Sequence, residues 1–167
     1  FFCEMIIILE GQGVHKINDA RYLVSSGDVF MLKGEDSHRF ENCKNIVVID
    51  MMFDPALLEQ TMAQLKKMSG FVSFFDLEPI FRGEHQFRSR LTMTRPELDQ
   101  AMVYVDALLH EFKHRAAGYE ASITGTLIGL MVYISRLYAG SEKPHTEQLI
   151  RIAEAINFMD ERYRSDI

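Results

Sequence analysis

The chain has little cysteine, no cluster of basic residues and no long hydrophobic run, and each shortage excludes a class of protein. Cys3 and Cys43 are its only cysteines, and they show neither CxxC spacing nor a paired framework. So few thiols in 167 residues are typical of a reducing compartment, which predicts a cytoplasmic location. The net charge is −6 and no Lys/Arg cluster is present, so this segment is not expected to hold nucleic acid itself.

The longest apolar run near the start is MIIIL, from Met5 to Leu9. A membrane-spanning helix needs roughly 20 apolar residues, so no membrane partner is expected. The sequence contains no internal repeat, and nothing in it resembles a P-loop, a Rossmann glycine run or a catalytic triad. What remains is an ordinary single domain, or one with an appendage.

Short apolar runs separated by turn residues fill residues 1–54 and predict a meandering sheet or barrel. The turn signals lie at residues 11–13, 18–19, 25–28, 34–37 and 41–45. The most apolar run, 46–53, predicts a buried strand in which Asp50 is the odd polar residue.

After this strand, Asp54 and Pro55 predict the start of a helix over residues 55–68. The aromatic-rich segment 70–85 predicts irregular structure, and alternation over 86–93 predicts one more strand.

The second half of the chain has helical patterning. Thr94 and Glu97 form a capping box, and two apolar-striped helices with a short connection predict an antiparallel hairpin over 95–140. Each stripe can face the partner helix, the barrel or a second subunit. A third helix is predicted from Thr146 to about Arg164. The stripe residues that we predict to support dimerisation are Leu98, Met102, Val105, Leu109, Phe112, Leu127, Met131 and Ile134.

The segment 27–42, GDVFMLKGEDSHRFEN, resembles the second half of the cupin signature. Gly27, His38 and Asn42 fall on its spacing, whereas Lys33 and Glu35 replace its proline and its second glycine. The first half of that signature ends in a glutamate and, after six residues, a glycine. The run EMIIILEG matches this spacing.

The order of these segments resembles the N-terminal half of an AraC/XylS-family transcription factor over nearly the whole chain. The similarity is carried by EMIIILEGQG, by GDVFMLKGEDSH, by the joint from Glu111 to Glu120 and by the helix end at Ser135–Tyr138. The tail LIRIAEAINFMDERYRSDI is similar to the first helix of that family's C-terminal DNA-binding domain. We therefore expect a chain cut before its helix-turn-helix units.

The resemblance implies an α+β fold, in which a cupin-like double-stranded β-helix (jelly-roll) barrel is followed by an antiparallel helical hairpin. Residues 1–94 would form the effector-binding barrel, 95–140 the dimerisation hairpin and 145–167 the start of a truncated DNA-binding domain. The implied function is the effector-binding region of a homodimeric bacterial regulator, not an enzyme. Such a protein senses a small molecule and contacts DNA only through the missing domain.

The phase of the strands and the family pattern predict a ligand site inside the barrel. A histidine, carboxylates and an aromatic wall suit a polar molecule such as a sugar. His38 can be a ligand contact, a structural histidine or part of a metal site. The predicted ligand-binding residues are Glu4, His15, His38, Phe40 and Asp50.

In metal-dependent cupins the residues matching Glu4 and His38 are metal ligands. Two further histidines of that site would fall upstream of Phe1, and regulators of this family usually lack a metal. We therefore predict no metal and no other cofactor. A metal-dependent cupin enzyme, such as an isomerase or a dioxygenase, remains the alternative.

His110 and His114 form a literal HExxH, a zinc-protease motif when both histidines face a cleft. At about 100° per residue they lie nearly opposite the apolar stripe of the same helix. This predicts a solvated face and disfavours a protease.

Overall fold

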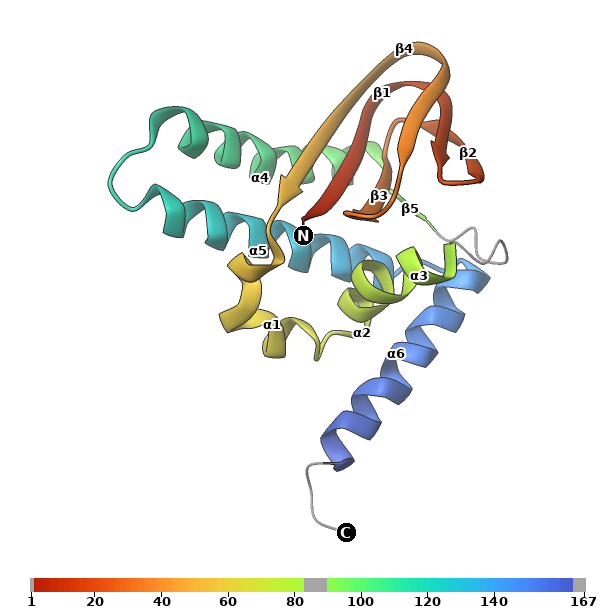
Figure 1. The fold of residues 1–167 in the computed structure, drawn as a ribbon, viewed down its shortest axis with the longest axis vertical. Coiled ribbons are helices and arrows are strands. Elements are labelled where there is room, and N and C mark those ends of the chain that lie inside the picture. The colour runs from red at the N-terminus through yellow and green to blue at the C-terminus, as the bar shows by residue number, and fades with distance from the viewer. Residues whose placement is uncertain (1, 83–89, 164–167) are drawn as a thin grey trace.

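The computed structural model describes residues 2–82 and 90–163, which form a curled antiparallel sheet with helices packed against one face (Figure 1). This confirms the predicted α+β class, and over the described residues the sheet forms half of a barrel. The strands are β1 Cys3–Ile17, β2 Ala20–Ser25, β3 Asp28–Lys33, β4 His38–Phe53 and β5 Leu91–Thr92. The helices are α1 Glu59–Leu65, α2 Ser69–Phe71, α3 Glu78–Arg82, α4 Arg95–His114, α5 Tyr119–Ala139 and α6 Pro144–Tyr163, with a 3-10 turn η1 Pro55–Leu58 and a π-helical segment η2 Val72–Leu77.

β1 is the central strand of the sheet. β4 pairs with it along its length, from Cys3 opposite Phe53 to Ile17 opposite His38. On the other side of β1, β3 pairs with its first part and β2 with its last part, and β5 pairs with β3. β1 and β4 therefore form one long two-stranded ribbon.

The β1–β4 ribbon bends in its middle. The pairing register shifts there three times, and Gly11 adopts a φ of +77°. Across the ribbon, Asn42 and Asn45 also have positive φ angles, of 52° and 49°. Such bulges bend a strand and increase its twist. The turns predicted at 11–13 and 41–45 are therefore wrong, because both segments continue as strand and curl the sheet.

The two faces of the sheet pack against different partners. Side chains alternate along a strand, so Ile6 and Ile8 point into the curl while Met5 and Ile7 point toward the helices. All four are buried, which explains the unbroken apolar run at this place in the sequence. The inner cluster of buried residues is Ile6, Ile8, Ile17, Tyr22, Val24, Phe30 and Leu32.

The segment after β4 is mostly helical. Asp54 caps η1 by accepting a hydrogen bond from the Ala56 N–H at 2.9 Å, but the helix predicted over 55–68 is split between η1 and α1. Residues 69–82, most of which were predicted to be irregular, form α2, η2 and α3 because their aromatic side chains pack into the core. Of the strand predicted over 86–93, the described part contains β5, and residues 86–89 lie outside the described residues. The buried aromatic residues of this segment are Phe71, Phe74 and Phe75.

α4 and α5 lie side by side and antiparallel beneath the sheet, and residues 115–118 join them (Figure 1). The capping box forms as predicted, with the Thr94 N–H donating to the Glu97 carboxylate at 2.6 Å. The Tyr133 hydroxyl of α5 donates to the Glu97 carbonyl of α4 at 3.1 Å. The capping box stabilises the start of α4, and the Tyr133 hydrogen bond joins the two helices.

α5 is the one helix of the described ranges with the length and mean hydropathy, 1.2, to cross a membrane. Core helices pass the same test, and α5 buries Leu130 and Ile134 completely. α6 leads away from the rest of the molecule (Figure 1), but its first half packs into the same core through Leu149 and Ala153. The assignment of 145–167 to a separate domain stays a prediction.

Candidate functional site

The bend in the ribbon brings three polar side chains together inside the curl. His38 Nε2 lies 3.0 Å from Glu4 Oε1, and His38 Nδ1 lies 3.1 Å from His15 Nε2. In the ladder, however, Glu4 pairs with Met52, and His38 pairs with Ile17 at the other end of β1. The three side chains therefore link the two arms of the bent ribbon across its concave face.

These contacts determine which ring nitrogens of His38 and His15 donate a hydrogen bond and which accept one. With Glu4 ionised, His38 Nε2–H donates to the carboxylate, and the Nδ1 of neutral His38 is then an acceptor. His15 Nε2–H donates to that nitrogen, so His15 Nδ1 carries no hydrogen. This Nδ1 is buried and has no hydrogen-bond partner among the described residues. A ligand hydroxyl that donates a hydrogen would satisfy it.

Aromatic rings surround His15. Its ring stacks on Phe40 with a centroid distance of 4.3 Å and meets Phe30 edge-on at 4.8 Å. Burial, followed by the nearby charges of His38 and Arg82, lowers the pKa of His15 to about 3. His15 is therefore neutral at physiological pH, as the acceptor role of its Nδ1 requires.

Asp50 joins this network from β4. One donor atom each of Glu4, His38 and Asp50 lies within 4.8 Å of the other two. Burial, followed by a hydrogen bond with Asp50, raises the pKa of Glu4, and the opposing effect of His38 is smaller. The Glu4 carboxylate is therefore protonated more readily than that of a free glutamate.

The prediction of a buried strand over 46–53 is wrong. Phe53 is the one buried residue in it, and Asp50 is exposed. The reason is that β4 pairs with β1 alone among the described strands, so solvent reaches its other edge.

Glu4, His38 and Asp50 are the residues that would hold a metal ion at this site, but they fit one poorly. Zinc ligands lie about 2.1 Å from the ion, so two of them are at most about 4.2 Å apart. The three donor atoms lie within 4.8 Å of one another, which is a slightly wider limit. Both ring nitrogens of His38 are also engaged, by Glu4 and by His15. The observed arrangement is a hydrogen-bonded network.

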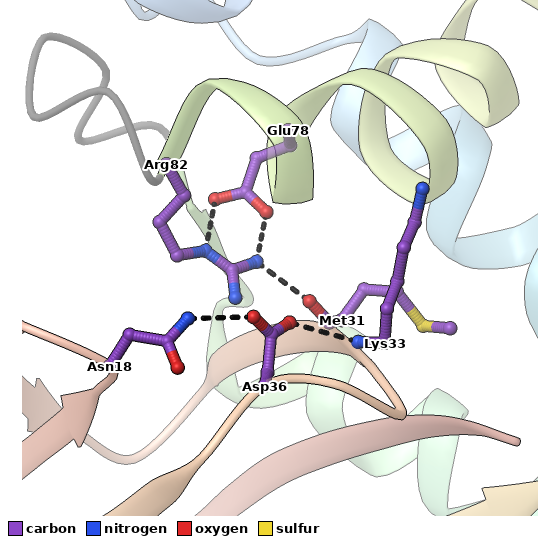
Figure 2. Close-up of polar contacts among 6 residues, drawn as sticks. All are labelled: Asn18, Met31, Lys33, Asp36, Glu78 and Arg82. Atoms are coloured by element: carbon purple, nitrogen blue, oxygen red, sulfur yellow. Dashed lines mark hydrogen bonds and ion pairs between the residues drawn. The ribbon is translucent and has the colours of Figure 1, made fainter.

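Arg82 was not predicted to be a site residue, because the segment around it was predicted to be irregular. Arg82 ends α3, and its side chain is 4% exposed. Its Nε donates to Glu78 at 3.1 Å, and its Nη2 donates to the other Glu78 oxygen and, at 2.8 Å, to the Met31 carbonyl (Figure 2). Burial raises the pKa of Glu78, and Arg82 opposes that shift. The spacing of four residues between these opposite charges is a helix signal that could have predicted the pair.

The residues predicted for dimerisation differ in how far they are exposed to solvent. Leu109 and Phe112 are 58% and 61% exposed, and they line an apolar groove of about 600 Å³ between β4 and the α4–α5 pair. Met102 is partly buried. The others pack inside the chain itself, so of this set Leu109 and Phe112 are the most accessible to another chain. The buried members are Leu98, Val105, Leu127, Met131 and Ile134.

The histidines of the HExxH segment are exposed, as the wheel pattern predicted. The His110 and His114 rings lie 4.1 Å apart, and His114 Nδ1 contacts the His110 carbonyl at 2.8 Å. Neither histidine lines the apolar groove.

Comparison with known proteins agrees with this architecture. A family model described as an AraC-like ligand binding domain matches residues 2–118, well over half of the 167 residues. The HTH-type transcriptional activator RhaR of Yersinia pestis bv. Antiqua (strain Angola) is 27% identical over 160 residues, 93% of this chain and 51% of that protein. RhaR of Enterobacter sp. (strain 638) is 29% identical over 70 residues, 42% of this chain and 25% of that protein. The chain thus spans about half the length, or less, of these curated relatives. The match to the family model, with which the curled sheet agrees, shows that the chain belongs to the AraC-like ligand binding domain family of transcriptional regulators.

Proposed function

We propose that the chain is the effector-binding and dimerisation region of a bacterial transcriptional regulator. The effector is a small polar molecule such as a sugar, and it binds inside the curl. The observation that carries this proposal is the network of Glu4, His38 and His15, which ends in a buried nitrogen without a partner among the described residues. Phe40 supplies an aromatic wall, and Asp50 lies at the exposed rim.

The effector acts by shifting the population of two conformers toward the one that it binds more tightly. A coupling free energy of about 1–3 kcal/mol is typical of such switches. Helix-turn-helix domains outside this chain contact the DNA, and the relatives named as HTH-type activators support this part of the proposal. In the whole regulator we expect the half-barrel to close into a jelly roll and the α4–α5 pair to form the dimer in the cytoplasm. This role requires neither catalysis nor a cofactor.

A metal-dependent cupin enzyme is the second candidate, and one observation favours it. Glu4, His38 and Asp50 cluster closely enough to receive an ion after a modest contraction. A metal would then stabilise the folded chain by mass action.

A thermal-shift screen distinguishes the two candidates. Sugars, sugar acids and other small metabolites are tested with and without Zn²⁺, Mn²⁺, Fe²⁺ and Ni²⁺. The proposal predicts a metal-independent rise in Tm for one chemical class. His38→Ala should abolish that rise, and His110→Ala, which removes an exposed histidine of α4, should preserve it.

A rise in Tm with divalent metals alone would support the enzyme candidate instead. A ligand that binds wild type and His38→Ala equally well would refute the role of His38. A screen without any hit would contradict the effector-binding function itself.

A further inference from the structure

A cavity of about 210 Å³ lies where α3 meets two turns of the sheet. The β1–β2 turn contributes Asn18 and Asp19 to its wall, the β3–β4 turn contributes Asp36, and α3 contributes Arg82. One water occupies about 30 Å³ of liquid, so the cavity has room for roughly seven waters. This is the volume of a small metabolite or of part of one.

The hydrogen bonds of the Arg82 guanidinium that the structure describes all lie on one side of the group. Arg82 Nε donates to Glu78, and Nη2 donates to Glu78 and to the Met31 carbonyl. Nη1 is buried and has no hydrogen-bond partner within the described part of the chain. In Figure 2 it points away from Glu78, toward the side of Asn18 and Asp36. Because an unpaired buried N–H is costly, an oxygen acceptor is expected beside it.

The Asp36 carboxylate is held in a fixed position on the same cavity wall. Asn18 Nδ2 donates to its Oδ1 at 2.8 Å, and the Lys33 backbone N–H donates to its Oδ2 at 3.0 Å. Each carboxylate oxygen has a second lone pair, so Asp36 can also accept from a ligand. A guanidinium donor and a carboxylate acceptor therefore border the same space.

The charges around the cavity favour an uncharged ligand. Glu78 neutralises Arg82 through two hydrogen bonds, and Asp19 and Asp36 add negative charge to the wall. A carboxylate or phosphate ligand would face these acidic groups, and the described residues that line the cavity offer no free cation to balance it. A hydroxyl group can instead accept from Arg82 and donate to Asp36 at the same time.

We propose that this cavity is a recognition subsite for a neutral, hydroxyl-rich small molecule such as a monosaccharide or an alditol. Arg82 Nη1 donates to one hydroxyl oxygen, and Asp36 accepts from the same or the adjacent hydroxyl. The subsite adjoins the concave network, because the Arg82 guanidinium lies over the Phe30 ring at 5.8 Å and His15 contacts the same ring. The assignment rests on the proposed effector-binding function, since the subsite would hold part of the effector.

Calorimetric titration of the chain with D-glucose, D-xylose, D-glucitol and D-glucuronate tests the subsite. Arg82→Lys keeps a cation opposite Glu78 but removes the planar fork that carries Nη1. Arg39→Lys, an exposed position on β4, is the matched control. A neutral probe should bind wild type and Arg39→Lys equally, and Arg82→Lys about tenfold or more weakly, because a hydrogen bond to a charged group is lost. Asp36→Asn, which replaces the accepting carboxylate with an amide of the same size, should also weaken binding, and this covers the case in which Arg82→Lys does not fold.

Equal binding of D-glucuronate and D-glucose would overturn the preference for a neutral ligand. Neutral probes that bind wild type, Arg82→Lys and Asp36→Asn equally well would overturn the subsite. If the same probes no longer bind His38→Ala, the proposed function would still stand. If no neutral probe binds, the cavity holds solvent only and the subsite is refuted. A hit from another chemical class in the thermal-shift screen would then still support the effector-binding function, whereas a screen without hits would refute both.

Discussion

Replacing His15 with phenylalanine tests whether this histidine stays neutral inside the folded chain. The ring is fully buried and stacks on Phe40, so phenylalanine keeps the aromatic contacts and removes the titrating group. Burial, with the nearby charges of His38 and Arg82, lowers the pKa of His15 to about 3. In an unfolded chain the pKa of histidine is about 6.5.

The sign and size of the effect follow from these two pKa values. As the pH falls below about 6.5, the unfolded chain takes up a proton at His15, and the folded chain does so only near the pKa of about 3. The unfolded state therefore binds more protons in this window, and acidification destabilises the fold. At about 1.36 kcal/mol per pKa unit, the loss through His15 reaches about 2 kcal/mol at about pH 5. Glu4, whose pKa is raised, acts in the opposite direction, and this contribution is common to wild type and variant.

Urea unfolding at a series of pH values between about 7 and 5, at constant ionic strength, measures this difference. On acidification the free energy of unfolding of wild type should fall by about 2 kcal/mol more than that of His15→Phe. At neutral pH the variant should lose about 1 kcal/mol, because the hydrogen bond to His38 is gone. His110→Phe, at an exposed position, should follow wild type at every pH. Parallel pH curves for wild type and His15→Phe would refute the neutral, buried state of His15.

Two further predictions concern the bend and the dimer. Gly11→Ala should cost about 2 kcal/mol or more in the free energy of unfolding, because φ is +77° and a Cβ would lie 2.3 Å from the Asn45 carbonyl oxygen. Gly118→Ala is the control, because φ is +85° there but an added Cβ would meet no atom within 4 Å, and it should cost only about 1 kcal/mol. If chemical denaturation gives the same loss of unfolding free energy for both variants, the bend at Gly11 is not tightly packed. Replacing Leu109 and Phe112 together with serine should convert a dimer into a folded monomer in sedimentation equilibrium. A wild-type monomer, or a variant that remains dimeric, would contradict this interface.

The sequence predicted those features of the fold that depend on local chemistry. The capping box of Thr94 and Glu97 forms as its spacing required. Asp54 caps the turn after β4 in the same way. Helical structure over residues 69–82 was missed because the phenylalanines there are buried on several sides, so no amphipathic period marks the segment.

The site was predictable to the extent that its residues lie on strands with a regular alternation. The two-residue period and the family pattern placed Glu4, His15, His38 and Phe40 on one inner face, and the structure brings them together. Their role in binding stays a prediction. Arg82 could not be placed from sequence, because its position depends on a tertiary contact with the Met31 carbonyl, 51 residues away.

The wrongly predicted turns and the candidate site have the same physical origin. Glycine and asparagine tolerate positive φ in turns and in bulges alike. The residue types at Gly11, Asn42 and Asn45 therefore cannot distinguish a chain reversal from a bulge within a strand. In this chain they form bulges, and the bend that results carries Glu4 to His38 although the two are not neighbours in the ladder. A straight ribbon would leave these side chains at opposite ends of β1. The backbone freedom of these residues is therefore a condition for the candidate site, and a substitution that straightens the ribbon should remove ligand binding together with the contact between Glu4 and His38.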